Sequence, residues 1–208
     1  QVPILLHKDI ASSLFGHYVG AISGGSLYRR SSFLLDSLGK QIFPEWLNIE
    51  ERPFIKSGLA SSSFDNEGVA CKDMTIVDGG KLSTYLYTTY SARELNTQTN
   101  GHAGGIHNWL VGDTGHSDSD LLKEMGTGLY VTELMGQGVN TVTGDYSRGA
   151  AGFWVENGVI QYPVHEVTIA GCLQDMFAGI VAIGKDKDLR GSVHTGSILI
   201  NQMKIAGS

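Results

Sequence analysis

Apolar residues recur at helical spacing in segments of this 208-residue chain. In Lys8–Ile22 they return every three to four positions, which predicts an amphipathic helix. The same spacing in Cys172–Ile183 places an apolar stripe on a second predicted helix, as is typical of a core-facing surface. A third helix is predicted over Ser117–Met125, because its first residues match a capping box and a glycine follows its last.

Other stretches cluster β-branched residues between glycine-rich turns, as strands do. Asn157-Gly158 is the strongest turn signal, because type I′ hairpins need positive φ at both central residues. Gly144–Gly149 and Asp78–Gly80 are predicted as further turns, and Pro163 is expected to end its strand. The predicted strands are Lys72–Val77, Lys81–Thr89, Val139–Thr143, Ala151–Glu156, Val159–Tyr162, Ser192–Ile200 and Gln202–Ile205. Together these elements predict an α+β fold dominated by hairpins, with about three helices.

The composition disfavours several classes of protein. A formal charge of −6 disfavours a nucleic-acid surface, which needs excess Lys and Arg to neutralise phosphates. No apolar run approaches the ~20 residues of a membrane helix. Cys71 and Cys172 are too few for a disulfide scaffold and lack a CxxC partner, so idle thiols in a reducing cytoplasm are expected. We therefore expect neither a nucleic acid nor a membrane as a partner.

Long blocks of the sequence resemble the PmbA/TldD family, on its PmbA branch (also called TldE). Gly136–Pro163 carries the family's signature region, and the likeness covers essentially the whole chain. Further matching blocks are Leu14–Gly25, Phe33–Gly39, Gly101–Trp109, Lys123–Gly128 and Met203–Gly207. The resemblance implies that residues 1–208 form a single C-terminal domain with a barrel-like, mostly antiparallel β structure. It also implies a fragment whose N-terminal half is absent.

The resemblance further implies a peptidase assembly in which one subunit carries zinc and the other does not. In the zinc-bearing branch the first helix opens with His-Glu-x-x-x-His, and a late Cys-Gly supplies another ligand. The matching residues here are His7, Lys8, Ser12 and Thr195, the last preceded by His194. Lys8 replaces a general base by a cation, while Ser12 and Thr195 replace an imidazole and a thiolate. The motif is degenerate, so no catalytic residue and no metal site are expected in this chain.

Two histidines flank a Gly-Gly pair in a predicted loop. His102 and His107 could hold a metal, because imidazole suits zinc or nickel, but a short gap within a flexible loop is a weak signal. A loop shaped by Gly104-Gly105 at an interface or beside a peptide groove is favoured. His102 and His107 are therefore predicted to contact a peptide or a partner.

A further group of candidates lies in the predicted turn Gly144–Gly149. Arg148 could contact a peptide or a partner, since its planar guanidinium suits carboxylates, with Asp145 and Tyr146 beside it. An internal Asp145–Arg148 pair that fixes the turn is the alternative, and both interpretations stay open. His17, on the first predicted helix, is interpreted as hydrogen-bonded or solvent-facing.

The resulting hypothesis is a non-catalytic subunit that pairs with a TldD-like zinc subunit in a cytoplasmic peptidase. By resemblance, that complex trims or degrades unfolded peptides, including microcin precursors and small antitoxin-type proteins. Zinc is expected in the partner, and no cofactor in this chain. One alternative is a metal-dependent hydrolase built on His7, His102, His107 or His194, and another is a self-associating scaffold. Some family members are named for a link to DNA gyrase, but nothing in these residues supports DNA contact. Because open sheet edges are costly, the isolated chain is expected to form a homodimer or to expose a sizeable apolar surface.

Overall fold

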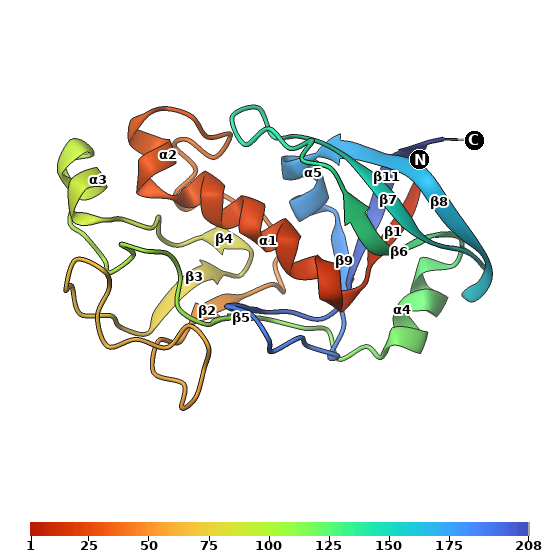
Figure 1. The fold of residues 1–208 in the computed structure, drawn as a ribbon, viewed down its shortest axis with the longest axis horizontal. Helices are drawn as coiled ribbons and strands as arrows, with labels where there is room; N and C mark the ends of the chain where they lie inside the picture. Colours follow the sequence, from red (N-terminus) through yellow and green to blue (C-terminus); the bar gives the residue numbers. More distant parts are fainter. Residues whose placement is uncertain (208) are drawn as a thin grey trace.

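The computed structural model describes residues 1–207 (Figure 1). Within this range the helices are α1 (Lys8–Ile22), α2 (Gly24–Tyr28), α3 (Thr89–Glu94), α4 (Asp118–Met125) and α5 (Leu173–Ala178). The strands are β1 (Val2–Leu6), β2 (Ile49–Glu51), β3 (Met74–Asp78), β4 (Lys81–Leu82), β5 (Trp109–Val111), β6 (Gly128–Met135), β7 (Asp145–Glu156), β8 (Val159–Cys172), β9 (Ile180–Ile183), β10 (Val193–His194) and β11 (Ile198–Ala206). The predicted α+β class is confirmed, although the described residues form five helices in place of about three.

Five strands close into a barrel. β1 pairs in parallel with β6, and β6, β7, β8 and β11 then follow in antiparallel order until β11 pairs with β1. β9 pairs with the first half of β11, on the edge that β8 occupies further along. The barrel-like, mostly antiparallel architecture built from hairpins is therefore confirmed.

A second sheet has the strand order β10-β5-β2-β3-β4, and α1 lies between it and the barrel (Figure 1). Tyr18 of α1 is fully buried, and its ring meets three others edge-on. These are Phe43, Trp109 of β5 and Phe177 of α5, at centroid distances of 4.9, 6.0 and 5.6 Å. One hydrophobic core therefore joins α1 to both sheets.

Two predicted helices are confirmed. α1 has the predicted bounds, and its buried residues are Ala11, Leu14, Phe15, Tyr18, Ala21 and Ile22. In α4 the Ser117 hydroxyl accepts the Asp120 N–H while the Asp120 carboxylate accepts the Ser117 N–H, which completes the predicted capping box. Among residues 1–207, no helix is long and apolar enough to cross a membrane.

The predicted turn at Gly144–Gly149 is wrong, because β7 runs without interruption through all but its first residue. The chain turns earlier, so Val139–Thr143 forms only a single bridge, from Val139 to β7. Gly144 has the positive φ of a turn, at 86°, whereas Gly149 does not. Later in β7, a Cβ on Gly152 would lie 1.9 Å from the carbonyl oxygen of Tyr130, so this glycine serves close strand approach.

The hairpin at Asn157-Gly158 is confirmed, with φ angles of 52° and 75°. The expected strand end at Pro163 is wrong, because β8 continues through it and pairs Pro163 with Phe153 of β7. β11 pairs with β8 only from Thr168 onward, so Pro163 lies where the outer edge of β8 has no neighbouring strand among the described residues. Proline is tolerated there because no ladder hydrogen bond requires its missing N–H.

Further predicted boundaries need correction. Cys172–Ile183 divides into α5 and β9 at Gly179, because the β-branched residues after the glycine pair with β11. The segment Lys81–Thr89 is a strand only over Lys81–Leu82, although the turn before it is confirmed by the positive φ of both its glycines. At the end of the chain, Ile198–Ala206 is one strand rather than the predicted two.

Candidate functional site

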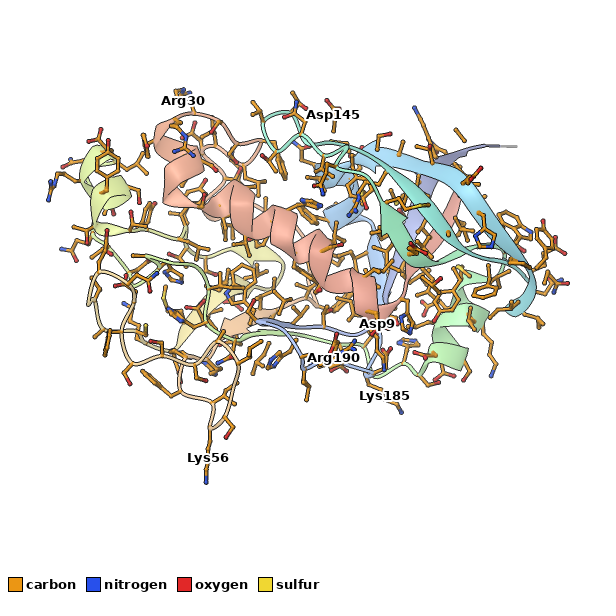
Figure 2. All side chains as sticks on the ribbon, in the orientation of Figure 1. Asp9, Arg30, Lys56, Asp145, Lys185 and Arg190 are labelled. Atoms are coloured by element: carbon orange, nitrogen blue, oxygen red, sulfur yellow. The ribbon has the colours of Figure 1, made fainter. Side chains whose placement is uncertain are left out.

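The start of α1 carries the first residue of the degenerate zinc motif. His7 is the N-cap of α1: its Nδ1 accepts the Asp9 backbone N–H at 3.4 Å, and its ring meets Tyr130 edge-on at 5.9 Å. The Arg190 guanidinium forms ion pairs with Asp9 and Asp188 at the same end of α1 (Figure 2). Nδ1 of His7 is thus engaged in capping the helix.

The structure brings the late segment of the motif next to this helix start. The Lys8 backbone N–H donates to Ser197 Oγ at 3.0 Å, which joins the first turn of α1 to the segment just before β11. Thr195, two residues earlier, is fully buried, and its hydroxyl donates to its neighbouring carbonyl at 3.2 Å. His194 is buried, and its Nε2 has no hydrogen-bond partner within residues 1–207. Ser12 is half-buried, one turn further along α1.

Two carboxyl groups share a hydrogen bond beside these segments. Burial, and then the charge of Asp186, raises the pKa of Asp118. Burial also pushes the pKa of Asp186 upward, but hydrogen bonds from Ser197 and Asp118 outweigh it, so this pKa is lowered. Ser197 donates its N–H to Asp186 Oδ1 at 3.1 Å and its hydroxyl to Oδ2 at 2.9 Å. Asp118 therefore holds its proton more tightly than Asp186 does.

The donor set at the motif does not fit a zinc site. Catalytic zinc takes three protein ligands, chiefly imidazole, thiolate or carboxylate, and keeps one position open. The matched positions offer the His7 imidazole, the Lys8 ammonium and the hydroxyls of Ser12 and Thr195. Across residues 1–207, no three His, Cys, Asp or Glu side chains gather in a group that could hold a metal ion. Of the matched residues, His7 therefore caps α1, and the four together do not form a zinc ligand set.

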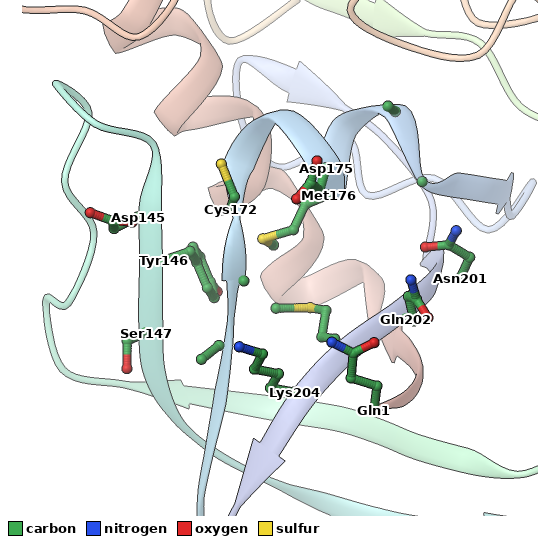
Figure 3. Close-up of a pocket in the computed structure, with 15 residues that line it drawn as sticks. Gln1, Asp145, Tyr146, Ser147, Cys172, Asp175, Met176, Asn201, Gln202 and Lys204 are labelled. Atoms are coloured by element: carbon green, nitrogen blue, oxygen red, sulfur yellow. The ribbon is translucent and has the colours of Figure 1, made fainter.

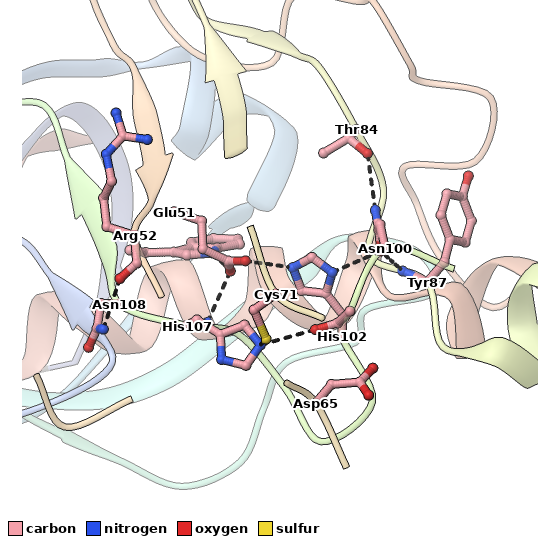
Figure 4. A network of polar contacts seen from close by, with 12 residues as sticks. Glu51, Arg52, Asp65, Cys71, Thr84, Tyr87, Asn100, His102, His107 and Asn108 are labelled. Atoms are coloured by element: carbon pink, nitrogen blue, oxygen red, sulfur yellow. Dashed lines mark hydrogen bonds and ion pairs between the residues drawn. The ribbon is translucent and has the colours of Figure 1, made fainter. Parts of the chain in front are cut away.

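The histidines of the Gly-Gly loop belong to an internal network centred on a buried carboxylate (Figure 4). Glu51 of β2 is 1 % exposed, and its Oε1 accepts His102 Nε2–H at 2.9 Å. Its Oε2 accepts the His107 backbone N–H at 3.0 Å and Trp109 Nε1–H at 2.8 Å. His102 Nδ1 faces Asn100 Oδ1 at 2.8 Å, so both ring nitrogens of His102 face oxygen acceptors. The network fixes the loop onto β2 and β5, and both imidazoles are buried within the chain.

A cysteine lies against the second of these histidines without being activated by it. Cys71 Sγ is 3.2 Å from His107 Nε2, and the same nitrogen is 3.0 Å from the Gly101 carbonyl oxygen. A carbonyl only accepts, so His107 Nε2 carries the proton and is no base for the thiol. Burial, and then the charges of Asp65 and Glu51, raises the pKa of Cys71. The pair therefore lacks the thiolate that cysteine chemistry needs.

The remaining candidates lie in β7 rather than in a turn, and strand alternation separates them. Figure 3 shows Asp145 on one side of β7 and Tyr146 on the other. Asp145 accepts the Thr143 hydroxyl, and no ion pair between Asp145 and Arg148 forms in the described chain. Tyr146 and Arg148, two residues apart, share the face directed at α1, where His17 meets the Tyr146 ring edge-on at 6.0 Å. His17 Nε2 is buried and has no partner within residues 1–207, which corrects its interpretation as hydrogen-bonded or solvent-facing.

A pocket of about 750 Å³ opens beside β7, between β8, α5 and β11 (Figure 3). Its polar lining includes Asp145, Ser147, Cys172, Asp175, Asn201 and Lys204. The Cys172 thiol is half-exposed and donates to Gln174 Oε1 at 2.6 Å. Mixed carboxylate, amide and ammonium groups suit polar groups such as those of a peptide backbone.

Comparison with known proteins identifies the family of this chain. Residues 1–207 match the profile of the PmbA/TldA metallopeptidase C-terminal domain. The chain belongs to the PmbA/TldD family. Metalloprotease PmbA of Escherichia coli O157:H7 is 59% identical over 207 residues, which are 100% of this chain and 46% of that protein. The Metalloprotease PmbA homolog of Haemophilus influenzae is 57% identical, again over 100% of this chain and 46% of its own length. The chain thus spans about half the length of these relatives.

Solved structures of the PmbA/TldD family share the fold. A Bacteroides thetaiotaomicron protein described as a modulator of DNA gyrase matches with a TM-score of 0.94 and 28% identity, covering 100% of this chain and 47% of its own. TldE from Thermococcus kodakarensis matches with a TM-score of 0.86 and 23% identity, covering 99% of this chain and 50% of its own. The second likeness shows the fold alone.

Sequence analysis missed the acidic groups that organise these sites. Glu51 stands beside Glu50 in a short strand that was not predicted, so nothing marked one of the two carboxylates as buried. In the sequence, Asp118 resembles an ordinary acidic residue in the first turn of a capped helix, and Asp186 lies between two lysines, so neither stands out. A usable signal for Glu51 is the demand for an acceptor by the two histidines and the tryptophan that are buried together at the second sheet.

Proposed function

We propose that this chain is the non-catalytic member of a two-subunit zinc peptidase. Its partner is a TldD-like subunit that carries the zinc, and the complex acts in the cytoplasm on unfolded peptides. Microcin precursors and small antitoxin-type proteins are the proposed substrates. The isolated chain contributes structure and peptide contacts rather than the hydrolytic centre.

The observation that carries this proposal is the ammonium of Lys8 at the position where the family motif needs a carboxylate base. An ammonium repels a metal ion and takes up no proton near neutral pH. Ser12 and Thr195 add no strong zinc ligand, which leaves His7 as the one imidazole at the matched positions. Family membership supplies the peptidase context, and the altered donors support the proposal that another subunit performs the chemistry.

Zinc analysis of the purified protein, alone and with its TldD-like partner, tests the proposal. We expect zinc and peptide hydrolysis only in the complex, and both to survive His7→Asn in this chain. Asparagine retains an N-cap acceptor for α1 while removing the imidazole, so the variant separates ligand loss from helix destabilisation. Stoichiometric zinc in the isolated chain that disappears in His7→Asn would refute the non-catalytic assignment.

A second test restores the missing donors. The double variant Lys8→Glu/Ser12→His returns a base and a second imidazole, and Thr195→Cys adds the third ligand. Because the Lys8 N–H contacts Ser197, close in sequence to Thr195, we expect the triple variant to bind zinc more tightly than the double variant. Peptidase activity should stay low, since groups that orient the imidazoles are missing. Equal zinc affinity of the two variants would contradict this placement of the lost site.

A second candidate function is metal-dependent hydrolysis by this chain itself. The name Metalloprotease PmbA, which the relatives carry, favours it. The third candidate function is that of a self-associating scaffold, and the exposed apolar residues at the tip of the β7–β8 hairpin favour it. There Val159, Ile160 and Tyr162 are 59%, 43% and 53% exposed, an apolar surface of the kind that contacts other chains. Light scattering of the purified protein, with and without the partner, distinguishes a homodimer from a subunit that awaits its heterodimer.

A further inference from the structure

A half-buried cation without a carboxylate partner among residues 1–207 lies on the face of β7 that is directed at α1. Arg148 forms no ion pair with any carboxylate in residues 1–207, and its Nε is buried without a hydrogen-bond partner. A partly buried guanidinium loses solvation, and proteins normally compensate it with a carboxylate or with several acceptors. Here the compensating group is absent from the described chain, which indicates that it comes from elsewhere.

Two further polar groups converge on this cation. Tyr146, two residues before Arg148 on the same face, is buried, and His17 of α1 meets its ring edge-on at 6.0 Å. His17 Nε2 is also buried and unpartnered within residues 1–207. Burial, and then the positive charge of Arg148, lowers the pKa of His17. At neutral pH the cluster therefore holds one positive charge, from Arg148, beside a neutral imidazole.

The helix surface around His17 leaves room for a ligand. A Cβ added to Gly16 or Gly20, the residues just before and three after His17 on α1, would meet no heavy atom within 4 Å. Large side chains at these positions would fill that space, and the sequence places glycine at both. His17 is thus flanked on α1 by two positions with open space, while the Tyr146 ring that it meets is buried.

We propose that Arg148, His17 and Tyr146 form a binding site for a single carboxylate. A guanidinium presents two parallel N–H groups to the two oxygens of a carboxylate, which gives this pair its strength and direction. One positive charge matches a monoanion better than the double charge of a phosphate. The imidazole and the phenol supply further polar contacts to the same oxygens. The carboxylate comes from the C-terminus of a bound peptide or from an acidic side chain within it.

The assignment to a peptide rests on the proposed function, whereas the carboxylate chemistry rests on the geometry alone. Zinc content and partner-dependent hydrolysis decide the proposed function, and neither is measured in a ligand titration. The two can therefore fail separately. A failed titration beside a working heterodimer would remove the site and keep the function.

The test follows the His17 ring by NMR in the intact protein during titration with three probes. These are acetylated trialanine with a free carboxyl terminus, the same peptide amidated, and an amidated peptide with glutamate in the middle. A bound carboxylate offsets the field of Arg148, so we expect the His17 pKa to rise on binding. A response to the first probe alone identifies a chain terminus, and a response to the third identifies an acidic side chain. No response to either, or an equal response to the neutral peptide, overturns the site.

Substitutions at the cation give an independent readout. Arg148→Met keeps much of the side-chain volume but removes the charge, and we expect about a tenfold or greater loss of affinity for the responding probe. Arg148→Lys keeps the charge without the fork, so an intermediate loss is expected. The control is Arg30→Met, an equal change at an exposed arginine near the end of α2 (Figure 2). Wild-type affinity in Arg148→Met, or an equal loss in Arg30→Met, refutes the proposal even if one variant folds poorly, because the wild-type titration stands without it.

Discussion

Replacing Glu51 by alanine removes the acceptor on which buried N–H groups from three residues depend. His102 Nε2, the His107 backbone N–H and Trp109 Nε1 all donate to this carboxylate at 2.8 to 3.0 Å. None of these residues is more than 9% exposed, so water does not reach the stranded donors without local opening. Glu51→Gln is the matched control, because it retains the size and one acceptor oxygen of the side chain.

The expected losses differ in size. Each of the three buried donors left without an acceptor costs about 1–3 kcal/mol, so Glu51→Ala should lower the free energy of unfolding by roughly 3–9 kcal/mol. In Glu51→Gln the amide oxygen can accept the two N–H groups that Oε2 holds. The amide N–H₂ can then donate to His102 Nε2, provided that the ring keeps its proton on Nδ1, facing Asn100. This variant should lose only about 1–2 kcal/mol, the charge-assisted part of the network.

Urea unfolding of the three proteins measures both values from the midpoints at a common slope. For a chain of this size, thermal unfolding should show a fall of about 2–4 °C for each kcal/mol. Equal midpoints for Glu51→Ala and Glu51→Gln would mean that an acceptor oxygen at this position adds nothing to stability. A loss of unfolding free energy below about 1 kcal/mol in Glu51→Ala would refute the reasoning, because three buried donors without an acceptor should cost more than that.

Two further predictions concern backbone approach and proton sharing. Gly152→Ala should destabilise the protein by about 1–3 kcal/mol, because its Cβ would collide with the Tyr130 carbonyl. Gly16→Ala, in open space on α1, should stabilise the protein by about 0.5–1 kcal/mol. Equal chemical-denaturation midpoints for the two variants would contradict both predictions. The raised pKa of Asp118 means that the folded state holds an extra proton between the unfolded and folded pKa values, so wild-type stability falls as pH rises through the folded pKa. Asp118→Asn keeps a donor for Asp186 and should remove this fall in stability. Unfolding midpoints measured at a series of pH values check this prediction. An unchanged dependence of the midpoint on pH would show that Asp118 is not the group responsible.

Local signals in the sequence predicted those elements whose causes are themselves local. The cap of α4 and the Asn157-Gly158 hairpin follow from hydrogen bonds and φ angles set within a few residues. The extended path of β7 does not, because Gly149 looks like a turn residue until its pairing with Met135 of β6 is known. In the same way, Ile180 fits a helical stripe, and only pairing with β11 makes it a strand residue.

The candidate site was predictable in its chemistry but not in its geometry. The loss of ligands at Lys8 and Ser12 can be read from residue types alone. The Glu51 network joins residues about fifty positions apart in sequence, so no local pattern reveals that His102 is buried. The convergence of His17 with Arg148 needed the knowledge that α1 and β7 face each other. Arg148 was identified for its carboxylate chemistry, although it was expected in a turn.

The pairing of β1 with β11 has a consequence for how the chain reaches its fold. These strands are the first and last of the described chain, and Figure 1 shows them side by side, so the barrel closes through contacts between residues nearly 200 positions apart. Such long-range closure slows folding, because the intervening chain loses conformational entropy before the strand pairing provides any stabilisation. During synthesis β1 is available long before β11 emerges, and until then its apolar edge stays unpaired on that side. A ribosome stalled before Ile198 would therefore release a chain prone to intermolecular strand pairing.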